Sequence, residues 1–234
     1  MSAREVAPSI TQIINRSIDT DVFPSIWKDA KVIPSFKSES KHDVSNYRPI
    51  AILPILSKVL EKHVHKALSQ FLNKFDLLRA AQSGFREKHS CETALIKTVD
   101  QWMESIDKGY LVGTIFLDLS KAFDLVNHEI LISKLRIYGL SNEATKWFVS
   151  YLTSRNQSTY MNGILSSSKR VTCGVPQGSI LGPLLFLIYI NDMDLTLKYC
   201  CADMYADDTT LHVTGTSTHD LNLKLQDDLK RISD

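Results

Sequence analysis

Apolar residues recur at helical spacing in several stretches of this chain, and the spacing predicts a helix in each of them. The longest stripe spans residues 56–75 and keeps its lysines largely off the apolar face, which predicts an amphipathic helix with a basic side. Further helices are predicted over residues 90–106, 128–138, 143–152, 180–190 and 221–232. The first of these begins at the cap residue Ser90. Its predicted buried face consists of Leu95, Val99, Trp102, Met103 and Ile106.

Three other stretches have strand character. Residues 111–117 form an apolar run that ends at Asp118. Residues 157–161 and the chain from Ile164 onward flank Asn162-Gly163, a pair typical of a tight hairpin turn. Residues 200–206 are predicted to pair with residues 209–213. Separate helices combined with hairpins indicate an α+β fold.

Size and composition limit the class of protein. With 234 residues and 44% hydrophobic content, the chain can bury a full core in one or two subdomains. No apolar run approaches the ~20 residues of a membrane span, and the N-terminus lacks the apolar core of a secretory signal. We therefore expect an intracellular protein that is not secreted and has no membrane partner. The four cysteines contain no C-x-x-C pair, which favours reduced structural thiols over a zinc site.

Charge is distributed unevenly, although the formal net charge is only +1. Residues 28–88 contain 12 Lys or Arg against 6 Asp or Glu, whereas residues 200–234 contain 3 against 7. A basic front and an acidic rear would suit a protein that binds phosphates with one part and metal ions with another. An ordinary scatter of solvated charges is the alternative.

The tetrapeptide Tyr205-Ala206-Asp207-Asp208 places two carboxylates where one predicted strand turns back into the next. Asp118 ends another predicted strand, and two strand ends that carry acids can face each other across one sheet. Carboxylate oxygens are the ligands that Mg²⁺ prefers, so the pattern predicts a divalent metal site. Asp203 shares the strand parity of Asp207, but we expect it to meet solvent or a lysine rather than a metal.

Five further blocks precede this tetrapeptide in a fixed order. They are Trp27-Lys28-Asp29-Ala30 through Lys37, Asn46-Tyr47-Arg48-Pro49-Ile50, Gln82-Ser83-Gly84-Phe85-Arg86, Phe116-Leu117-Asp118-Leu119-Ser120-Lys121-Ala122-Phe123-Asp124 and Gly174-Val175-Pro176-Gln177-Gly178-Ser179-Ile180-Leu181-Gly182-Pro183. Together the six blocks resemble the reverse transcriptase of non-LTR (LINE-type) retrotransposons, over nearly the whole chain. The resemblance implies a right-hand polymerase fold. Fingers, helical and basic, would span residues 1–110, an antiparallel-sheet palm would span residues 111–234, and the thumb would be absent.

The resemblance also implies an activity, RNA-directed DNA synthesis. The partners would be an RNA template, a DNA primer and dNTPs, and the cofactor would be two Mg²⁺ ions, with Mn²⁺ possible. Nucleotide addition is an in-line phosphoryl transfer that needs little covalent work from protein side chains. Asp118 and Asp207 are the implied main metal ligands, Asp208 completes the site, and the backbone carbonyl of Leu119 supplies a further oxygen.

Substrate-binding residues follow from the same resemblance. Phe123 matches the aromatic steric gate that excludes a 2′-hydroxyl, although a core phenylalanine is the simpler reading of the residue alone. Lys37 and Arg48 match the residues that bind the incoming triphosphate, whereas alone each is a solvated surface charge. Gln177 and Gly178 match a loop beside the sugar and the templating base.

Nucleic-acid contacts are implied for one block and for one residue of the tetrapeptide, Tyr205. The block contributes Gln82, Gly84, Phe85 and Arg86. The sequence leaves open whether these residues contact the template RNA or brace the fingers. Asp124 and Asp192 are interpreted as a helix cap and a surface charge.

The chain departs from the family pattern mainly at its ends. It stops within the helix that follows the acidic hairpin, so we expect the next palm block, the primer-grip hairpin and the thumb to be missing, along with any endonuclease domain before Met1. A piece of a larger polyprotein or a decayed copy would fit, located in the nucleus or a cytoplasmic ribonucleoprotein. A catalytically inactive nucleic-acid-binding remnant is the main alternative, and a purely structural interaction module is a third.

Overall fold

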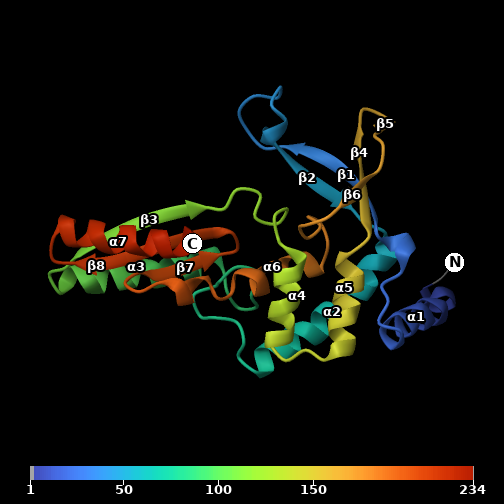
Figure 1. The fold of residues 1–234 in the computed structure, drawn as a ribbon, viewed down its shortest axis with the longest axis horizontal. Helices are drawn as coiled ribbons and strands as arrows, with labels where there is room; N and C mark the ends of the chain where they lie inside the picture. The colour runs from blue at the N-terminus through green and yellow to red at the C-terminus, as the bar shows by residue number, and fades with distance from the viewer. Residues whose placement is uncertain (1–2, 234) are drawn as a thin grey trace. The chain divides into compact units, whose positions relative to one another are not determined.

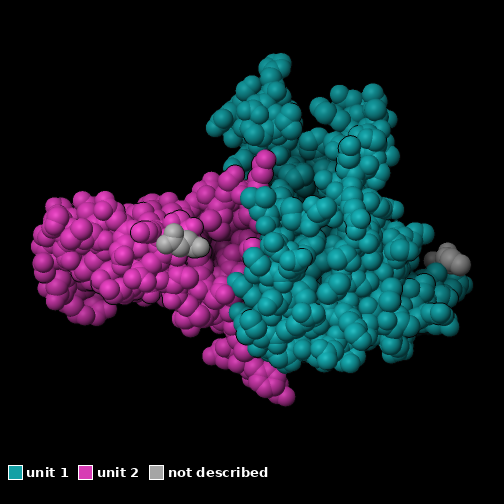
Figure 2. All heavy atoms as spheres, viewed as in Figure 1, with its two compact units in different colours: residues 1–71, 123–185 teal, residues 72–122, 186–234 magenta. Residues whose placement is uncertain are grey.

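The computed structural model describes residues 3–233, which divide into two compact units. Each unit combines two segments of the chain, residues 1–71 with 123–185 and residues 72–122 with 186–234 (Figure 2). Strand pairing between distant segments produces this interleaving. A single boundary after residue 110 therefore does not describe the packing, and the assignment of fingers and palm stays a prediction.

The first unit contains a mixed sheet with helices beside it (Figure 1). Its elements are α1 (Ala3–Asp19), β1 (Asp29–Phe36), β2 (Tyr47–Ile52), most of α2 (Ile55–Lys74), α4 (His128–Ile137), α5 (Asn142–Leu152), β4 (Arg155–Met161), β5 (Ile164–Leu165), β6 (Lys169–Val171) and the start of α6 (Leu181–Ile190). Strand β1 pairs antiparallel with β2 and parallel with β4. Strand β4 also pairs antiparallel with β5 and β6.

Strands β1 and β2 were not predicted, so the expected helical character of residues 1–110 does not extend to residues 29–36 and 47–52. Each strand contains a proline, and Pro34 lies opposite Pro49 in the pair. Proline removes a ladder hydrogen bond and weakens the strand signal in a sequence. The predicted helices of this unit and the hairpin after residue 161 are confirmed. Asn127 caps α4, and the hairpin turn after β4 has positive φ angles at both Asn162 (51°) and Gly163 (83°).

An aromatic cluster forms part of the core of the first unit. Phe23 is fully buried and makes edge-to-face contacts with Trp27, Trp147 and Tyr151 at centroid distances of 6.1, 5.7 and 5.1 Å. The buried guanidinium of Arg155 lies 5.7 Å from the Phe23 ring. These contacts pack the segment before β1 against α5 and the start of β4.

The second unit contains a three-stranded antiparallel sheet in the order β3-β8-β7, in which β7 pairs with β8 as predicted. Its strands are β3 (Leu111–Asp118), β7 (Cys201–Tyr205) and β8 (Asp208–Gly215). Helices α3 (Cys91–Asp107) and α7 (Thr218–Ser233) flank the sheet (Figure 1). Helix α7 covers the apolar face, where Leu211, Val213 and Leu221 are buried together. The opposite face of the sheet meets α3.

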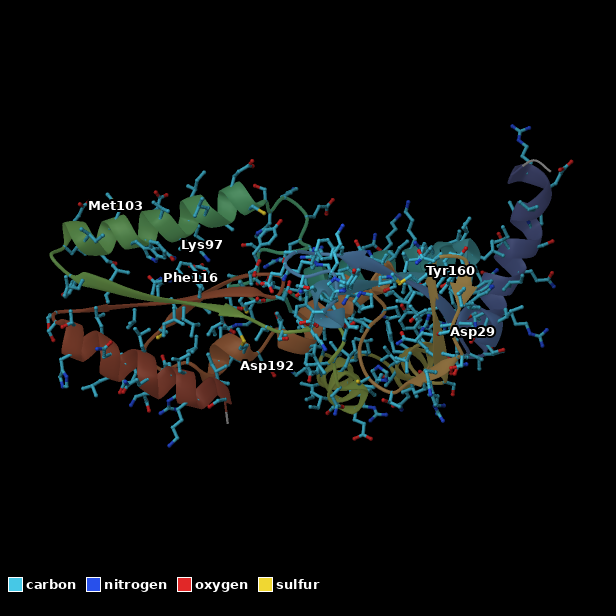
Figure 3. All side chains as sticks on the ribbon, turned by 90° about the horizontal axis from the view of Figure 1, so that it is seen from above. Asp29, Lys97, Met103, Phe116, Tyr160 and Asp192 are labelled. Atoms are coloured by element: carbon cyan, nitrogen blue, oxygen red, sulfur yellow. The ribbon has the colours of Figure 1, made fainter. Side chains whose placement is uncertain are left out.

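Helix α3 has the predicted ends and the Ser90 cap, but its predicted buried face is wrong. Leu95, Met103 and Ile106 are 62%, 53% and 52% exposed, and Val99 is also exposed. The helix buries Thr98 instead and only partly buries Trp102. Met103 and Lys97 are labelled on this helix in Figure 3.

The face of the sheet that α3 meets explains this orientation. It carries polar residues, among them Asp203 and the buried His212. Lys97 of α3 forms an ion pair with Asp203, with Nζ 3.0 Å from Oδ1. Trp102 makes an edge contact with His212 at 6.3 Å. Because buried polar groups need polar partners, this polar sheet face packs against the polar side of α3, and the apolar stripe of the helix stays exposed.

No helix within residues 3–233 is long and apolar enough to cross a membrane. All four cysteines are free thiols, and only Cys200 is buried. Burial raises the pKa of Cys200 to about 12, with Asp228 adding to the effect, so this thiol stays protonated at neutral pH.

Candidate active site

Three acidic residues lie at one end of the sheet in the second unit. The register of β3 and β8 places Asp118 directly opposite Asp208. The register of β7 and β8 pairs Tyr205 with Asp208, which leaves Ala206 and Asp207 as a two-residue turn. Side chains at directly opposite positions have Cβ atoms about 5 Å apart. The fold thus gathers carboxylates that are 89 or 90 residues apart in the chain.

The donor set suits a hard divalent cation. Asp118 and Asp208 are exposed and Asp207 is half-buried, so water and ions can reach the carboxylates. Like charges directly opposite each other destabilise a sheet, and a bound cation relieves that repulsion. Within residues 3–233, however, no three acidic, histidine or cysteine side chains are arranged as a metal-binding group. The Leu119 carbonyl accepts a hydrogen bond from the Ala122 amide at 3.3 Å. The metal roles of these residues therefore stay predictions.

The turn that carries Asp207 is held in an unusual backbone conformation. Ala206 has φ 59° and is buried, although the left-handed region favours glycine. A non-glycine residue there costs roughly 1–2 kcal/mol. Strain of this kind persists only where the surroundings enforce it.

A segment just before α3 lies along the edge of β7 and provides such surroundings. The Met204 amide donates to the Ala81 carbonyl and the Ser83 amide to the Met204 carbonyl, each at 2.8 Å. Gln82, in the middle of the segment, reaches the turn with its side chain. The sequence left open whether this block contacts the template RNA or braces the fingers. The structure adds a third role, because Gln82 and Gly84 pack against the acidic turn.

The remaining residues of that block are placed differently. Phe85 is 55% exposed, whereas Arg86 donates from one guanidinium nitrogen to the carbonyls of Arg79 and Gln82. Tyr205 is half-buried, and its hydrogen bond with the thiol of Cys91 raises the Tyr205 pKa. Contacts of Phe85, Arg86 and Tyr205 with nucleic acid stay predictions.

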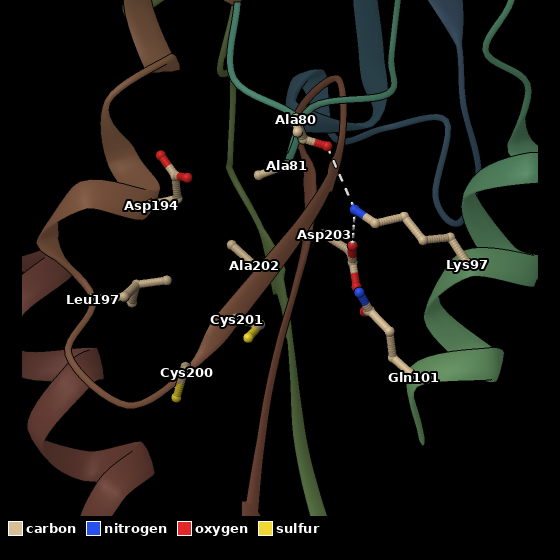
Figure 4. A pocket seen from close by; sticks show the side chains of 10 residues that line it. All are labelled: Ala80, Ala81, Lys97, Gln101, Asp194, Leu197, Cys200, Cys201, Ala202 and Asp203. Carbon is tan, nitrogen blue, oxygen red and sulfur yellow. Dashed lines mark hydrogen bonds and ion pairs between the residues drawn. The ribbon is translucent and has the colours of Figure 1, made fainter. Parts of the chain in front are cut away.

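Asp203 meets a lysine, as the sequence predicted, and takes no part in the acidic end of the sheet. Figure 4 shows Lys97 reaching both Asp203 and the backbone carbonyl of Ala80 across a pocket of about 280 Å³. His212 lies 3.4 Å from Asp203 on the same face. Burial lowers the His212 pKa, while Asp203 partly opposes that effect.

Three of the predicted substrate residues lie on connected loops of the first unit. The Ala51 amide of β2 donates to the Gln177 carbonyl at 2.7 Å. The Gln177 side chain donates from Nε2 to Oδ1 of Asp124 at 3.0 Å, and the Val175 amide donates to the Phe123 carbonyl at 2.8 Å. Backbone and side-chain hydrogen bonds therefore connect the Phe123–Asp124 segment and β2 with the Gln177 loop. Asp124, predicted to be a cap, instead orients Gln177.

The two glycines of this loop are required by close contacts with the backbone of neighbouring segments. Gly178 has φ 114°, and a Cβ atom there would lie 2.5 Å from the Ala51 carbonyl oxygen. Gly174 has φ 85°, and a Cβ atom there would lie 2.6 Å from the Asp124 carbonyl oxygen. Close approach of β2 and of the Asp124 segment accounts for both residues.

The two predicted phosphate-binding residues are exposed. Arg48 lies on β2 opposite Ser35, and Lys37 follows β1, with its amide bonded to the Asn46 carbonyl at 2.8 Å. Both are on the β1–β2 hairpin, two strands that the sequence did not predict. Their exposure leaves the side chains accessible to a ligand.

Glu61 is a buried acid that the sequence analysis missed. Its Oε2 accepts from the amides of Ile180 and Leu181 at 2.8 and 3.3 Å, and its Oε1 accepts from the Ser57 hydroxyl at 2.7 Å. A carboxylate at a helix N-terminus satisfies amides that have no partner within the helix. Glu61 thus fixes the start of α6, directly after the Gln177 loop.

A comparison with protein families places these residues in context. Residues 39–232 match the model of the reverse transcriptase (RNA-dependent DNA polymerase) family. The chain belongs to this family.

Relatives among known proteins include polymerases of mobile elements. The RNA-directed DNA polymerase from mobile element jockey of Drosophila melanogaster is 34% identical over 211 residues, covering 85% of this chain and 22% of the relative. The probable RNA-directed DNA polymerase from transposon X-element, also of D. melanogaster, is 30% identical over 243 residues, covering 99% of this chain and 26% of the relative. The predicted kinship with LINE-type reverse transcriptases is confirmed. The chain spans about a quarter of the length of these relatives.

A solved structure gives the same result for the fold. The chain resembles apo telomerase from Candida tropicalis, truncated from its C-terminal domain, with a TM-score of 0.59 and 13% identity over 89% of this chain and 47% of that one. The likeness supports the α+β polymerase fold of this reverse transcriptase domain. Fingers, palm and thumb remain finer assignments.

Proposed function

We propose that this reverse transcriptase domain adds dNTPs to the 3′ end of a DNA primer, copying an RNA template. The observation that carries the proposal is the gathering of Asp118, Asp207 and Asp208 at one end of an antiparallel sheet. Family membership supports the reaction, and the carboxylate donors suit the cofactor that it needs.

The acids would hold two Mg²⁺ ions, or Mn²⁺, with help from the Leu119 carbonyl. Bound metal supplies activation of the attacking 3′-oxygen and neutralisation of the leaving pyrophosphate. The contribution of the protein is to fix the carboxylates at one point, so that little reorganisation is needed during the reaction.

Substrate binding would use the first unit. Lys37 and Arg48 would bind the triphosphate with their exposed charges, and Arg48 can make paired hydrogen bonds to phosphate oxygens. Gln177 and Gly178 would line the sugar and the templating base, and Phe123 would exclude a 2′-hydroxyl. Residues 1–110 would form the fingers and residues 111–234 the palm.

Phe85, Arg86 and Tyr205 would contact the template–primer duplex. Because the relatives are about four times longer, we propose that the domain works within a larger polyprotein with endonuclease and thumb regions. Its place would be the nucleus or a cytoplasmic ribonucleoprotein.

Primer extension tests the proposal. The 234-residue chain is incubated with an RNA template, an annealed DNA primer, dNTPs and Mg²⁺, and each added nucleotide should follow the template sequence. Chelation with EDTA should stop incorporation, and fresh Mg²⁺ should restore it. Salt-sensitive RNA binding without incorporation would contradict polymerase activity and favour the inactive remnant. Lack of RNA binding at low salt would favour the structural module.

Phe123→Val should admit ribonucleotides. If Phe123 lies under the sugar, the smaller side chain leaves room for the 2′-hydroxyl, and the preference for dNTPs over NTPs should fall by about 10- to 100-fold. The measurement is the ratio of kcat/KM for dCTP and CTP on one template. Phe75→Val, at a 54% exposed position of the other unit with no proposed role in binding, is the control. An unchanged ratio would assign Phe123 to the core.

A further inference from the structure

We propose that Gln82 is a positioning residue that holds the acidic turn in its catalytic conformation. The inference rests on the proposed function, because the turn carries Asp207. It adds to that function a residue outside the acidic cluster that would set the rate without touching substrate or metal.

Gln82 binds both backbone polar groups of Ala206. The Ala206 amide donates to Oε1 of Gln82 at 2.9 Å, and Nε2 of Gln82 donates to the Ala206 carbonyl at 3.2 Å. The Gly84 amide donates to the same Oε1 at 2.7 Å. Two amide donors must face the oxygen and a carbonyl must face the nitrogen, so these partners also fix the orientation of the side-chain amide.

Burial separates this role from a contact with RNA. Gln82 is 1% exposed, and its backbone forms a parallel bridge with Met204 of β7. A side chain that is closed off from solvent and hydrogen-bonded to the turn cannot reach a template strand. Gln82 therefore does not fit the nucleic-acid-binding role that the family resemblance implied.

The strain at Ala206 explains why the turn needs the hydrogen bonds between Gln82 and Ala206, which we call the clamp. Alanine with φ 59° lies in a region that costs roughly 1–2 kcal/mol, comparable to the net gain from one or two hydrogen bonds. Two hydrogen bonds from one buried amide group to Ala206 can thus hold a turn that the local sequence disfavours, while the bond from the Gly84 amide orients that group. Without them the turn should sample other conformations, and Asp207 would move with it.

Gly84 allows the clamp to lie close to the turn. A Cβ atom at Gly84 would lie 2.1 Å from the Ala206 nitrogen and 2.9 Å from its Cα atom. These neighbours are backbone atoms, so any larger residue at position 84 would displace the turn. Gln82 and Gly84 thus act on the same target by different means.

The test compares Gln82→Met with wild type by two measurements. Methionine keeps the length and burial of the side chain and removes its amide. Misplacement of a reacting group by about 1 Å can cost 10²-fold in rate. We therefore expect the single-turnover rate of nucleotide incorporation to fall 10- to 100-fold and half-saturation to need several-fold more Mg²⁺, while the Kd for primer–template stays within twofold.

The second measurement does not depend on activity. Hydrogen exchange of the Ala206 amide should become about tenfold faster in Gln82→Met, because its acceptor is gone. Gln101→Met is the matched control, since Gln101 is a partly buried glutamine of the same unit whose Oε1 has no hydrogen-bond partner within residues 3–233. It should leave both the rate and the exchange of Ala206 unchanged.

Rescue provides the sharpest test. Glycine adopts φ near 60° without penalty, so adding Ala206→Gly to Gln82→Met should recover about tenfold of the lost rate. A role for Gln82 in overall stability alone predicts no such recovery.

The outcomes separate the clamp from the proposed function. Unchanged Ala206 exchange and an unchanged rate in Gln82→Met would overturn the clamp. A raised Kd for primer–template with unchanged Mg²⁺ dependence would also overturn it, in favour of a template contact. If wild type itself incorporates nothing, the proposed function fails, and the exchange of Ala206 still decides whether Gln82 holds the turn.

Discussion

Replacing Asp118 with asparagine is expected to reduce nucleotide incorporation by about 10³-fold without unfolding the protein. Asp118 is exposed at the end of β3, opposite Asp208, so its charge serves no buried partner. Asparagine keeps the shape and removes one of the negative charges that would hold Mg²⁺. Asp207→Asn should behave alike, because Asp207 lies in the turn between β7 and β8 at the same end of the sheet.

The thermal stability of the same variants should hold or rise slightly, although their activity falls. Asp118→Asn removes a repulsion between facing carboxylates worth roughly 0.2–1 kcal/mol, so the thermal midpoint should hold or rise slightly. Mg²⁺ should raise the midpoint of wild type and have a smaller effect on the variant. Asp100→Asn, at an exposed position of α3, is the matched control for loss of one charge. Full activity of Asp118→Asn would remove Asp118 from the metal site.

Replacing Asp228 with asparagine is expected to destabilise the protein by roughly 2–4 kcal/mol, although this residue is remote in sequence from every catalytic block. Asp228 lies on α7 and is fully buried. Its Oδ1 accepts from the Lys198 amide at 2.8 Å, and its Oδ2 accepts from the Tyr199 and Cys200 amides at 2.8 and 2.6 Å. An asparagine amide would turn a donor toward at least one of these N–H groups.

Asp227→Asn is the matched control. Asp227 is the adjacent residue, but its side chain is 43% exposed and pairs only with Arg231 on the same helix within the described part of the chain. An exposed pair of this kind contributes at most about 0.5 kcal/mol. Urea unfolding of both variants gives the comparison. Equal midpoints would show that the three amides find other partners.

The effect of Asp228 should depend on pH. Burial by itself raises the pKa of this carboxyl, but the amides of Cys200, Lys198 and Tyr199 outweigh burial and leave the pKa below its ordinary value. A depressed pKa means that the carboxylate stabilises the fold above the unfolded pKa of about 3.9 and loses this contribution as pH falls through the folded pKa. The difference between wild type and Asp228→Asn should therefore be constant near neutral pH and shrink below about pH 4.

Asp228 also illustrates a signal that the sequence contains. It occurs on the apolar stripe of α7, three residues after Leu225 and four before Ile232, where an acid is unexpected. An acid on the buried face of a helix needs partners, and here the partners are the amides that precede β7. Glu61 has a similar position in α2, three residues before Val64 and seven before Leu68, but its partners at the start of α6, about 120 residues away, are not visible in the sequence.

The sequence by itself determined most local elements and the family. Helical spacing located α2, α4, α5, α6 and α7, the Asn162-Gly163 pair located a hairpin, and six ordered blocks identified the family. These features depend on neighbouring residues or on residue type, both of which are visible along the chain.

Only the tertiary structure decided which surfaces meet. The pairing of β1 with β4 and the hydrogen bond between Gln82 and Ala206 join segments that are far apart in the chain. The apolar stripe of α3 is exposed because of the sheet face that this helix meets. The face that a helix buries depends on what lies opposite, and a polar sheet face carrying Asp203 and His212 reversed the preference of α3. Long-range contacts of this kind leave no periodic pattern in a single sequence, because neither partner's local propensity depends on the other.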